Sequence, residues 1–495
     1  MNKFTHSLSV AKKALKVTVG LFVFSLMASQ CFAQSPSDTA GKSRRDREYL
    51  QLINSLYCYI QQNYVEEVDP ELLYQGAIKG MLDSLGDPYS SYLSKNDWRS
   101  LSDTTSGSFG GVGLSISKPA ESTPGKPSYV EVAQPIDDSP GDRAGIQPGD
   151  KIIKIDGVDT STITMNEVLG MLRGTVGEPV TVTILRGKAM EFDRTLVRAI
   201  IENPTVKYGM IRDTGYIRIS EFSTNTADRV QDAIDSFRRA NYKSLVIDLR
   251  NNGGGLLAAA VNIADKFIDN GIIVSTKSRI PYENNEFKAS ARKTTVDPSI
   301  PVIVLINRAS ASASEILAGA LKDTHRAYLV GERSFGKGSV QIPTELIDND
   351  GFKITVAKYY SPSDVNIDKT GIPPDREVPY ETFSEDEEKA YAALMESTEI
   401  ADYVEEHPGM EDVDIGSYAV DLQKKYDLDL RILRKAVRNE VYRTRKALPY
   451  DLDYDLQLSA ALEIFKSEDV RALLGQTKTL KEIQEESENK VTAKK

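Results

Sequence analysis

The hydrophobic pattern changes along the chain, and each change marks a region with a different predicted structure. Between residues 46 and 105 apolar side chains recur every three or four positions, the spacing of one helix face. From 109 to 199 short β-type runs follow, at 113–116, 129–132, 151–155 and 180–185, with glycine- and proline-rich turns between them. One helical segment, 165–172, interrupts these runs. We therefore expect a small β-domain with one helix.

Residues 201–380 alternate between buried strands and helices. Strands are predicted at 216–219, 244–249, 302–306 and 327–330, and helices at 226–240, 256–268 and 313–322. Because this alternation is typical of a sheet covered by helices, the region predicts an α/β core. Residues 381–495 are polar and acidic at first and then helical, with an amphipathic stripe between 422 and 437.

The first 33 residues have the pattern of an export signal. Four lysines precede an apolar run at 17–28, and Ala33 offers a small residue for cleavage before Gln34. The run is shorter than the ~20 residues that a comfortable membrane span needs. We expect cleavage and export to a bacterial periplasm or cell envelope. Acylation at Cys31 and an uncleaved anchor are the alternatives.

Charge and rare residue types narrow the chemistry. A net charge of −11 disfavours nucleic acid as the main partner. Removal of the leader would leave Cys58 as the one cysteine, so no intramolecular disulfide is expected. Without a His/Cys cluster we expect no metal and no other cofactor. The chain has three histidines, and none is placed to serve as base for a serine nucleophile.

Ser312 is the candidate nucleophile. It follows the predicted strand 302–306 and begins a helix, where backbone N–H groups stabilise negative charge on an oxyanion. The pattern Ser312-x-x-Glu315 is also a capping box, in which both side chains only close the helix N-terminus. The motif alone leaves both interpretations open.

Lys337 is the candidate base. A lysine in water has a pKa near ~10.4, so it acts as a base only where burial favours its neutral form. Phe335, Val340 and the flanking glycines would exclude water from it. A surface lysine in a glycine-rich turn is the alternative. Residues 331–337 also match most of a phosphate-binding loop, but Gly338 replaces its hydroxyl residue and a strand follows, which disfavours nucleotide binding.

Three consecutive glycines, Gly253, Gly254 and Gly255, follow the predicted strand 244–249. Glycine lets backbone N–H groups approach a substrate closely, so one of these N–H groups is a candidate donor to an oxyanion. The alternative is that the glycines only form a turn. His325 lies near the end of the helix that Ser312 begins, too far away to reach its hydroxyl.

Together these motifs resemble the C-terminal processing peptidases, the tail-specific serine/lysine proteases of peptidase family S41, over roughly residues 48–380. The resemblance is carried by residues 248–255, 310–316 and 336–341. Residues 109–200 resemble the PDZ domain of that family through 110–114 and 144–150.

The resemblance implies an α/β multidomain protein with a crotonase-like protease core, an inserted PDZ β-domain and helical N- and C-terminal regions. The expected parts are a signal peptide, an N-terminal helical region, the PDZ domain, the protease core and a C-terminal helical region, at 1–33, 34–108, 109–200, 201–380 and 381–495.

The resemblance also assigns roles. It implies Ser312 as nucleophile, Lys337 as general base and Gln341 as the group that orients the lysine. The N–H groups of Gly254 and Ala313 would form the oxyanion hole.

Further roles follow from the same resemblance. In some members an acidic residue at the position of Asp323 has an auxiliary role. In the PDZ domain, backbone amides of one loop would bind the C-terminal carboxylate of a substrate, whose tail adds as a strand. The residues of this loop are Gly111, Val112, Gly113 and Leu114.

The predicted function is an exported serine endopeptidase that cleaves proteins near their C-termini. Its expected partners are protein or peptide substrates with free C-terminal tails. A homo-oligomer through the terminal helices and a peripheral membrane association are left open. The competing interpretation is a catalytically inactive PDZ adaptor on a protease-derived scaffold, and the intact Ser312, Lys337 and Gln341 argue against it.

Overall fold

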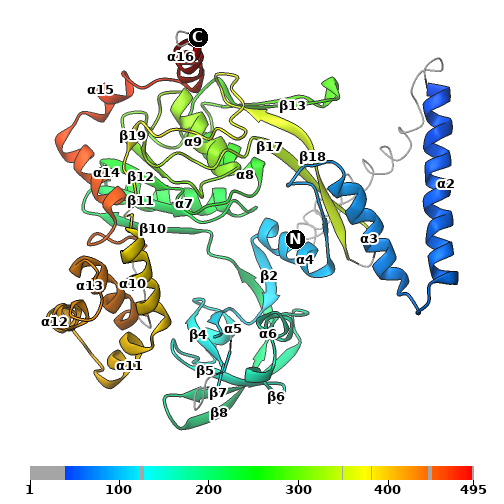
Figure 1. The fold of residues 1–495 in the computed structure, drawn as a ribbon. Helices are drawn as coiled ribbons and strands as arrows, with labels where there is room; N and C mark the ends of the chain where they lie inside the picture. The colour runs from blue at the N-terminus through cyan, green and yellow to red at the C-terminus, as the bar shows by residue number, and fades with distance from the viewer. Residues whose placement is uncertain are drawn as a thin grey trace, which may run out of the picture. The chain divides into compact units, whose positions relative to one another are not determined.

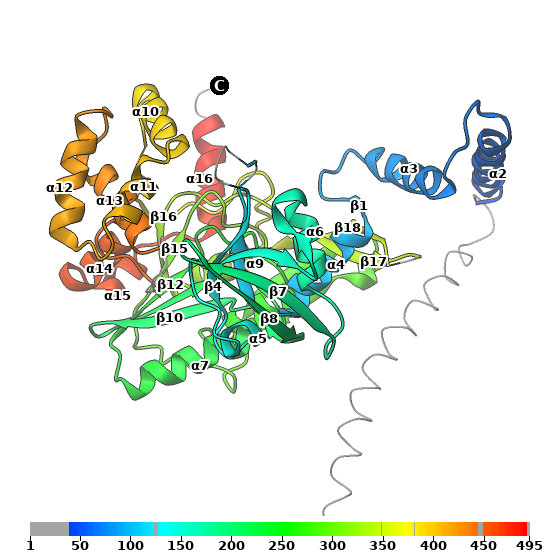
Figure 2. The same cartoon turned by 90° about the horizontal axis from the view of Figure 1, so that it is seen from below.

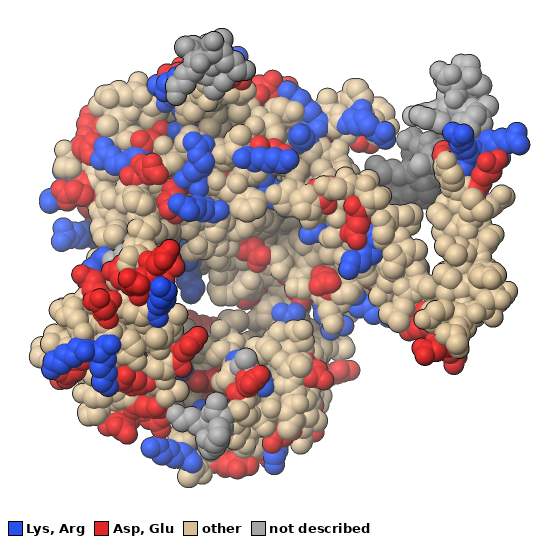
Figure 3. Space-filling model, viewed as in Figure 1, with Lys and Arg blue, Asp and Glu red and all other residues tan. Residues whose placement is uncertain are grey.

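A computed structural model of the protein describes residues 39–119, 121–122, 127–347, 349–380, 382–443 and 449–492. The signal peptide predicted at 1–33 lies outside these residues. The chain divides into two compact units, residues 1–92 and 93–495. No helix in the described ranges is long and apolar enough to cross a membrane. On the face shown in Figure 3, acidic and basic side chains are interspersed.

The first unit is helical, as the periodicity predicts. It contains α2 (Thr39–Asn63) and α3 (Pro70–Asp83), followed by the start of a short strand, β1 (Ser91–Leu93), that was not predicted. Asp69 caps α3 by accepting a hydrogen bond of 2.9 Å from the Glu71 N–H. In α2 the side chains of Leu50, Leu52 and Leu56 are more than half exposed.

The second unit begins with α4 (Lys95–Ser106) and the PDZ-like domain (Figure 1). Strands β2 (Ser108–Gly111) and β9 (Ala199–Glu202) pair antiparallel and close the two ends of this domain, close to the predicted limits 109 and 200. The sheet between them has the strand order β3-β4-β5-β7-β8, with β6 paired to β5. Its elements are β3 (Leu114–Ser117), β4 (Val130–Pro135), α5 (Pro140–Arg143), β5 (Lys151–Ile155), β6 (Val158–Asp159), α6 (Met165–Leu172), β7 (Pro179–Arg186) and β8 (Met190–Val197).

The four strands and the helix predicted for this domain are present. Strand β8 was not predicted, since most of its side chains are exposed or half-buried and it lacks a clear apolar face. Val132, Ile152 and Ile184 are completely buried and pack with Val168 of α6, so alternate strand positions build the core of the domain.

The central sheet of the second unit has six strands in the order β10-β11-β12-β15-β16-β19. Neighbours from β11 to β19 are parallel, and β10 pairs antiparallel at one edge. The strands are β10 (Val206–Ile211), β11 (Thr214–Ile219), β12 (Ser244–Asp248), β15 (Val302–Ile306), β16 (Tyr328–Gly331) and β19 (Arg376–Glu377). Every residue of β12 and β15 is buried, as expected for strands covered on both faces.

Helices cover both faces of this sheet. One face carries α7 (Thr226–Arg239), α8 (Leu257–Ala264) and α9 (Ala313–Asp323), which form the largest hydrophobic cluster with it. The opposite face carries α14 (Leu456–Ser467) and α15 (Val470–Leu474), whose apolar side chains pack on Val246, Ile303 and Leu305. In Figure 2 the sheet lies between α7 and α14.

The region predicted as helical from 381 to 495 therefore has two parts. Helices α10 (Glu385–Glu396), α11 (Glu399–Glu406), α12 (Asp412–Gln423) and α13 (Leu430–Val441) share a core of their own. Helices α14, α15 and α16 (Leu480–Thr492) pack on the α/β core, so that core does not end at residue 380.

A second, antiparallel sheet lies beside the core. Of its strands only β17 (Ser339–Glu345), which follows Gly338, was predicted. Strand β17 pairs with β18 (Gly351–Tyr360), which pairs with β13 (Ile272–Ser278), and β13 pairs with β14 (Asn285–Lys288). Gln341 lies on β17 and Tyr359 on β18, so this sheet supplies side chains to the candidate site.

Candidate active site

Ser312 lies where the loop after β15 enters α9. Its backbone φ is 55°, a left-handed value that is uncommon for residues other than glycine. Such a conformation costs about 1–3 kcal/mol and persists only where the surrounding structure enforces it. The neighbours Ala311 and Ala313 are buried, whereas Ser312 itself is half-buried. The turn therefore keeps the serine at the surface of a packed core.

The loop that carries Ser312 is fixed against the loop after β12. The Ser310 hydroxyl donates to the Leu249 carbonyl at 2.8 Å. The Asn252 carbonyl accepts from the Ala311 N–H at 3.0 Å and from the Ser314 hydroxyl at 2.9 Å. These bonds bring the glycine-rich segment against the serine turn.

Glu315 is the central polar group of the site. It is 1% exposed, and its carboxylate accepts four hydrogen bonds. Oε2 accepts from the N–H groups of Ser312 and Lys337, both at 2.9 Å, and Oε1 accepts from the Gly336 N–H at 2.7 Å and the Ser334 hydroxyl at 2.6 Å. Burial raises the pKa of Glu315, and the hydrogen bonds to its carboxylate oppose that shift. One carboxylate thus connects the backbones of the predicted nucleophile and the predicted base.

Tyr359 makes a second connection between the same two residues. Its hydroxyl donates to the Lys337 carbonyl and lies 3.3 Å from the Ser312 carbonyl oxygen. The ring is 3% exposed, so this contact is inside the protein. Tyr359 belongs to no motif, and the alternation of β18 does not distinguish it from its neighbours.

The glycines beside Lys337 are needed for close packing. A Cβ at Gly336 would lie 2.8 Å from the Gly371 backbone nitrogen, and one at Gly338 would lie 2.7 Å from the Asp368 nitrogen. Both distances are too short for a real side chain. The segment 366–371 therefore packs against this loop only because glycine flanks Lys337, which is half-buried.

Gln341 projects from β17 beside β18. Its amide nitrogen donates to the Ser339 hydroxyl at 2.9 Å and to the Thr355 hydroxyl at 3.1 Å. These bonds fix the amide within the sheet. The implied role of Gln341 in orienting Lys337 stays a prediction.

Gly254 lies directly against the serine turn. A Cβ there would come within 2.8 Å of the Ser312 Cβ and 3.0 Å of the Ala313 nitrogen, and its φ is 106°, so glycine is required. The structure thus brings the two predicted oxyanion donors side by side. The Gly254 N–H, however, donates to the Asn252 side chain at 2.8 Å. Its role as an oxyanion donor stays a prediction.

Comparison with known proteins identifies the family. Residues 213–378 match the model of peptidase family S41, residues 131–186 match a PDZ domain, and residues 19–97 match the N-terminal domain of the activating protease CtpB. A carboxy-terminal-processing protease of Bartonella bacilliformis is 35% identical over 448 residues, which cover 89% of this chain and 98% of that protein. The chain belongs to the carboxy-terminal-processing proteases of family S41. The predicted family, fold class and peptidase class are therefore confirmed.

Other relatives of this family show similar agreement. The carboxy-terminal processing protease CtpA of Bacillus subtilis is 34% identical over 360 residues, which cover 72% of this chain and 74% of that protein. A carboxyl-terminal-processing protease of Synechocystis sp. is 38% identical over 317 residues, which cover 62% of this chain and 72% of that protein.

Asp323 connects the C-terminal end of α9 to two other segments of this S41 peptidase. Its carboxylate accepts from the Leu480 N–H at 2.7 Å, and from the Ser363 N–H at 3.0 Å and hydroxyl at 2.6 Å. Asp323 is the last residue of α9 and Ser312 precedes the first, so a helix length of roughly 16 Å separates them. The bond to Leu480 anchors α16, and the auxiliary role expected for Asp323 stays a prediction. His325, two residues beyond the end of α9, is exposed and pairs with Thr477.

The PDZ loop from Gly111 to Leu114 is oriented by its carbonyl groups. The Val112 carbonyl accepts from the Gly141 N–H at 2.8 Å, and the Gly113 carbonyl accepts from the Ile136 N–H at 2.8 Å. Leu114 begins β3, which has one neighbour, β4, in the described part of the sheet.

Among the described residues, no group of three or more His, Cys, Asp or Glu side chains is arranged to hold a metal ion.

The hydrogen bonds of Glu315 generate a test. Glu315→Gln places an amide NH₂, which cannot accept, opposite two of the four donors. Each buried donor left unpaired costs about 1–3 kcal/mol, so the free energy of unfolding should fall by a few kcal/mol. The displacement of Ser312 relative to Lys337 should lower kcat by roughly 10–100-fold. Urea unfolding and peptide cleavage measure the two effects.

Glu332→Gln is the matched control for this variant. Glu332 is also buried, but its carboxylate pairs with the exposed Arg308 at 3.5 Å. We expect this control to keep its kcat. An unchanged kcat in Glu315→Gln would contradict the positioning role of this carboxylate.

Proposed function

We propose that this S41 peptidase hydrolyses peptide bonds with a Ser312–Lys337 dyad and cleaves its substrates near their C-termini. The observation that carries the proposal is the Glu315 carboxylate, which bonds the backbones of both residues at 2.9 Å. A nucleophile and base held by one buried group are positioned before substrate arrives, which lowers the entropic part of the barrier.

In the proposed reaction neutral Lys337 removes the proton from the Ser312 hydroxyl as Oγ attacks the peptide carbonyl. The N–H groups of Ala313 and Gly254 stabilise the oxyanion, and the protonated lysine then gives its proton to the leaving amine. For Gly254 this requires its N–H to turn from the Asn252 side chain toward the substrate. Water activated by the same lysine releases the acyl group from Ser312.

We further propose that the PDZ domain binds the C-terminal tail of the substrate. The edge position of β3 supports this, because an extended peptide can pair with the unpaired side of an edge strand. Backbone amides from Gly111 to Leu114 would receive the terminal carboxylate. The partners are thus proteins and peptides with free C-termini.

Export to the periplasm or cell envelope is also part of the proposal. It rests on the lysine-rich start, the apolar run 17–28 and Ala33 in the sequence. If the leader is retained, we also propose a peripheral association of the protein with the membrane. N-terminal sequencing of the exported chain distinguishes cleavage before Gln34 from retention.

The dyad is tested by substitution. Ser312→Ala and Lys337→Arg should each lower kcat by at least about 10³-fold, because alanine has no nucleophile and arginine stays protonated. Lys353→Arg, at a half-buried lysine of β18, is the control and should keep activity. EDTA should leave the rate unchanged. Full activity of Ser312→Ala would contradict the proposed dyad. Peptide binding without cleavage by the unaltered chain would favour the inactive PDZ adaptor.

Tail recognition is tested with the substrate. A cleavable peptide with a C-terminal amide loses charge-assisted hydrogen bonds to the PDZ loop, so its kcat/KM should be about tenfold lower than that of the free acid. N-terminal acetylation of the same peptide is the control and should have no effect. Equal kcat/KM for acid and amide would exclude carboxylate recognition.

Self-association through the N-terminal helices is the last part of the proposal. The exposed Leu52 and Leu56, one helical turn apart, give α2 an apolar surface that a second copy would cover. Leu52→Glu should shift the chain toward monomer in light scattering, because a buried charge without a partner is unfavourable. Asn54→Glu on the same helix should not shift it. Identical masses for both variants and the unaltered chain would contradict this interface.

A further inference from the structure

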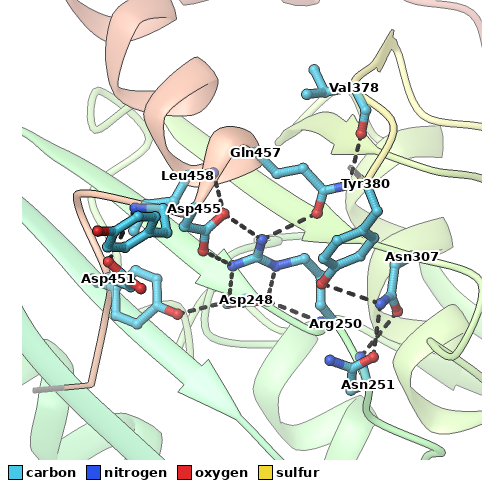
Figure 4. Close-up of polar contacts among 12 residues, drawn as sticks. Asp248, Arg250, Asn251, Asn307, Val378, Tyr380, Asp451, Asp455, Gln457 and Leu458 are labelled. Carbon is cyan, nitrogen blue, oxygen red and sulfur yellow. Dashed lines mark hydrogen bonds and ion pairs between the residues drawn. The ribbon is translucent and has the colours of Figure 1, made fainter. Parts of the chain in front are cut away.

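A buried arginine connects the C-terminal helices to the loop after β12. Arg250 is 5% exposed and lies between two carboxylates, Asp248 and Asp455 (Figure 4). Toward Asp248, Nε donates at 2.9 Å and Nη2 at 2.6 Å. Toward Asp455, Nη1 donates at 2.7 Å and Nη2 at 2.6 Å, and Nη1 also donates to the Gln457 amide oxygen at 3.1 Å. All five N–H groups of the guanidinium therefore have an acceptor.

The two carboxylates come from different elements of the core, the central strand β12 and the start of α14. Asp248 ends β12 and also accepts from the Tyr216 hydroxyl at 2.7 Å. Asp455 caps α14, where it accepts from the Leu458 N–H at 2.9 Å. Gln457 in turn donates to the Val378 carbonyl at 2.7 Å. The arginine thus joins the central sheet, α14 and the segment after β19.

Asp248 and Arg250 stabilise each other in their charged forms. Burial by itself raises the pKa of Asp248, but the hydrogen bonds and charge of Arg250 outweigh burial and lower that pKa. Burial disfavours the Arg250 cation, yet Asp248 and Asp455 raise its pKa above the ordinary value. Such a desolvated, bidentate arrangement has a fixed geometry, because any displacement leaves a buried charge unpaired.

Arg250 immediately precedes the loop that touches the nucleophile. Asn251 has a φ of 59°, and its N–H donates to the Asn307 side chain at 3.0 Å, while Asn307 donates back to the Asn251 side chain at 2.8 Å. Asn252 is completely buried, and its carbonyl accepts from Ala311, next to Ser312. Arg250 thus lies four residues before Gly254, the glycine that lies against the serine turn.

We propose that Asp455 is a positioning residue for proteolysis: through Arg250 it fixes the loop 251–254 against Ser312, so α14 supports the active site as well as the fold. This inference rests on the proposed dyad and adds a requirement for the C-terminal segment. A merely structural role would give Asp455 the same importance as any ion pair that attaches this segment to the core.

The chain supplies such an ion pair for comparison. Glu468, at the end of α14, pairs in a bidentate manner with Arg376 of β19, at 2.5 and 2.9 Å. It attaches the same segment to the same sheet without contact to the loop after Arg250. Glu468→Gln therefore removes one charge from the attachment and leaves the site alone.

The test compares Asp455→Asn with Glu468→Gln in the full chain. Asparagine keeps one acceptor oxygen and caps a helix as well as aspartate does, so α14 retains its N-terminus. It loses one charge-assisted bond to Arg250. We expect kcat for a tail peptide to fall by about tenfold or more with KM within about threefold, because the loop acts on the reacting centre rather than on tail binding. Glu468→Gln should keep kcat within about twofold, and its loss in Tm should be smaller because this pair is about one third exposed.

A second variant covers a failure of Asp455→Asn to fold. Arg250→Lys keeps the charge but cannot bond both carboxylates in a bidentate manner, and it should lower kcat in the same way. Equal kcat in Asp455→Asn and Glu468→Gln, or an unchanged kcat in Arg250→Lys, would overturn the inference. Ser312→Ala is assayed beside them. If it is inactive, such a result overturns the positioning role alone, and if it is active the proposed function fails as well.

Discussion

The arrangement of the site depends on one buried carboxylate, that of Glu315. Its four hydrogen-bond donors are all uncharged groups. Glu315 is satisfied by three backbone N–H groups and one hydroxyl, from the serine turn and from the loop of Lys337. A carboxylate taken out of water requires such donors, so the two loops cannot separate without leaving it unpaired. The relative position of Ser312 and Lys337 is thus a consequence of backbone contacts. It does not require their own side chains to attract each other.

The topology of the sheet explains why these loops meet. Ser312 follows β15 and Lys337 follows β16, and the two strands are parallel neighbours. The glycine-rich loop follows β12, the neighbour on the other side of β15. The carboxyl ends of parallel strands lie at one edge of a sheet, where sites of α/β proteins form. Three successive loops therefore converge on one place, and Gly254, Gly336 and Gly338 permit the approach because a Cβ at any of them would collide with a neighbouring segment.

Much of this could be predicted from the sequence, because each strand and the loop after it are local in the chain. The strand at 302–306, the helix after it and the capping partner Glu315 follow from spacing alone, and the family motifs point to Ser312 and Lys337. Tyr359 could not be found in this way, since its role depends on where a distant strand packs. The bond from the Gly254 N–H to Asn252 depends on a side-chain orientation that no pattern encodes. Asp323 resembles a site residue by position, yet the helix length places it at the far end of α9.

The role of the C-terminal helices shows a further limit of periodicity. An amphipathic pattern indicates that a helix buries one face but does not identify its partner, so α14 could not be assigned to the core from its sequence. The central sheet, however, required a cover: a parallel sheet is buried on both faces, and α7, α8 and α9 occupy only one. α14 supplies the second face and brings Asp455 to the arginine that precedes the glycine-rich loop. Because the same helix fills the core and pairs with Arg250, the stability of the sheet and the geometry of its catalytic edge depend on one segment.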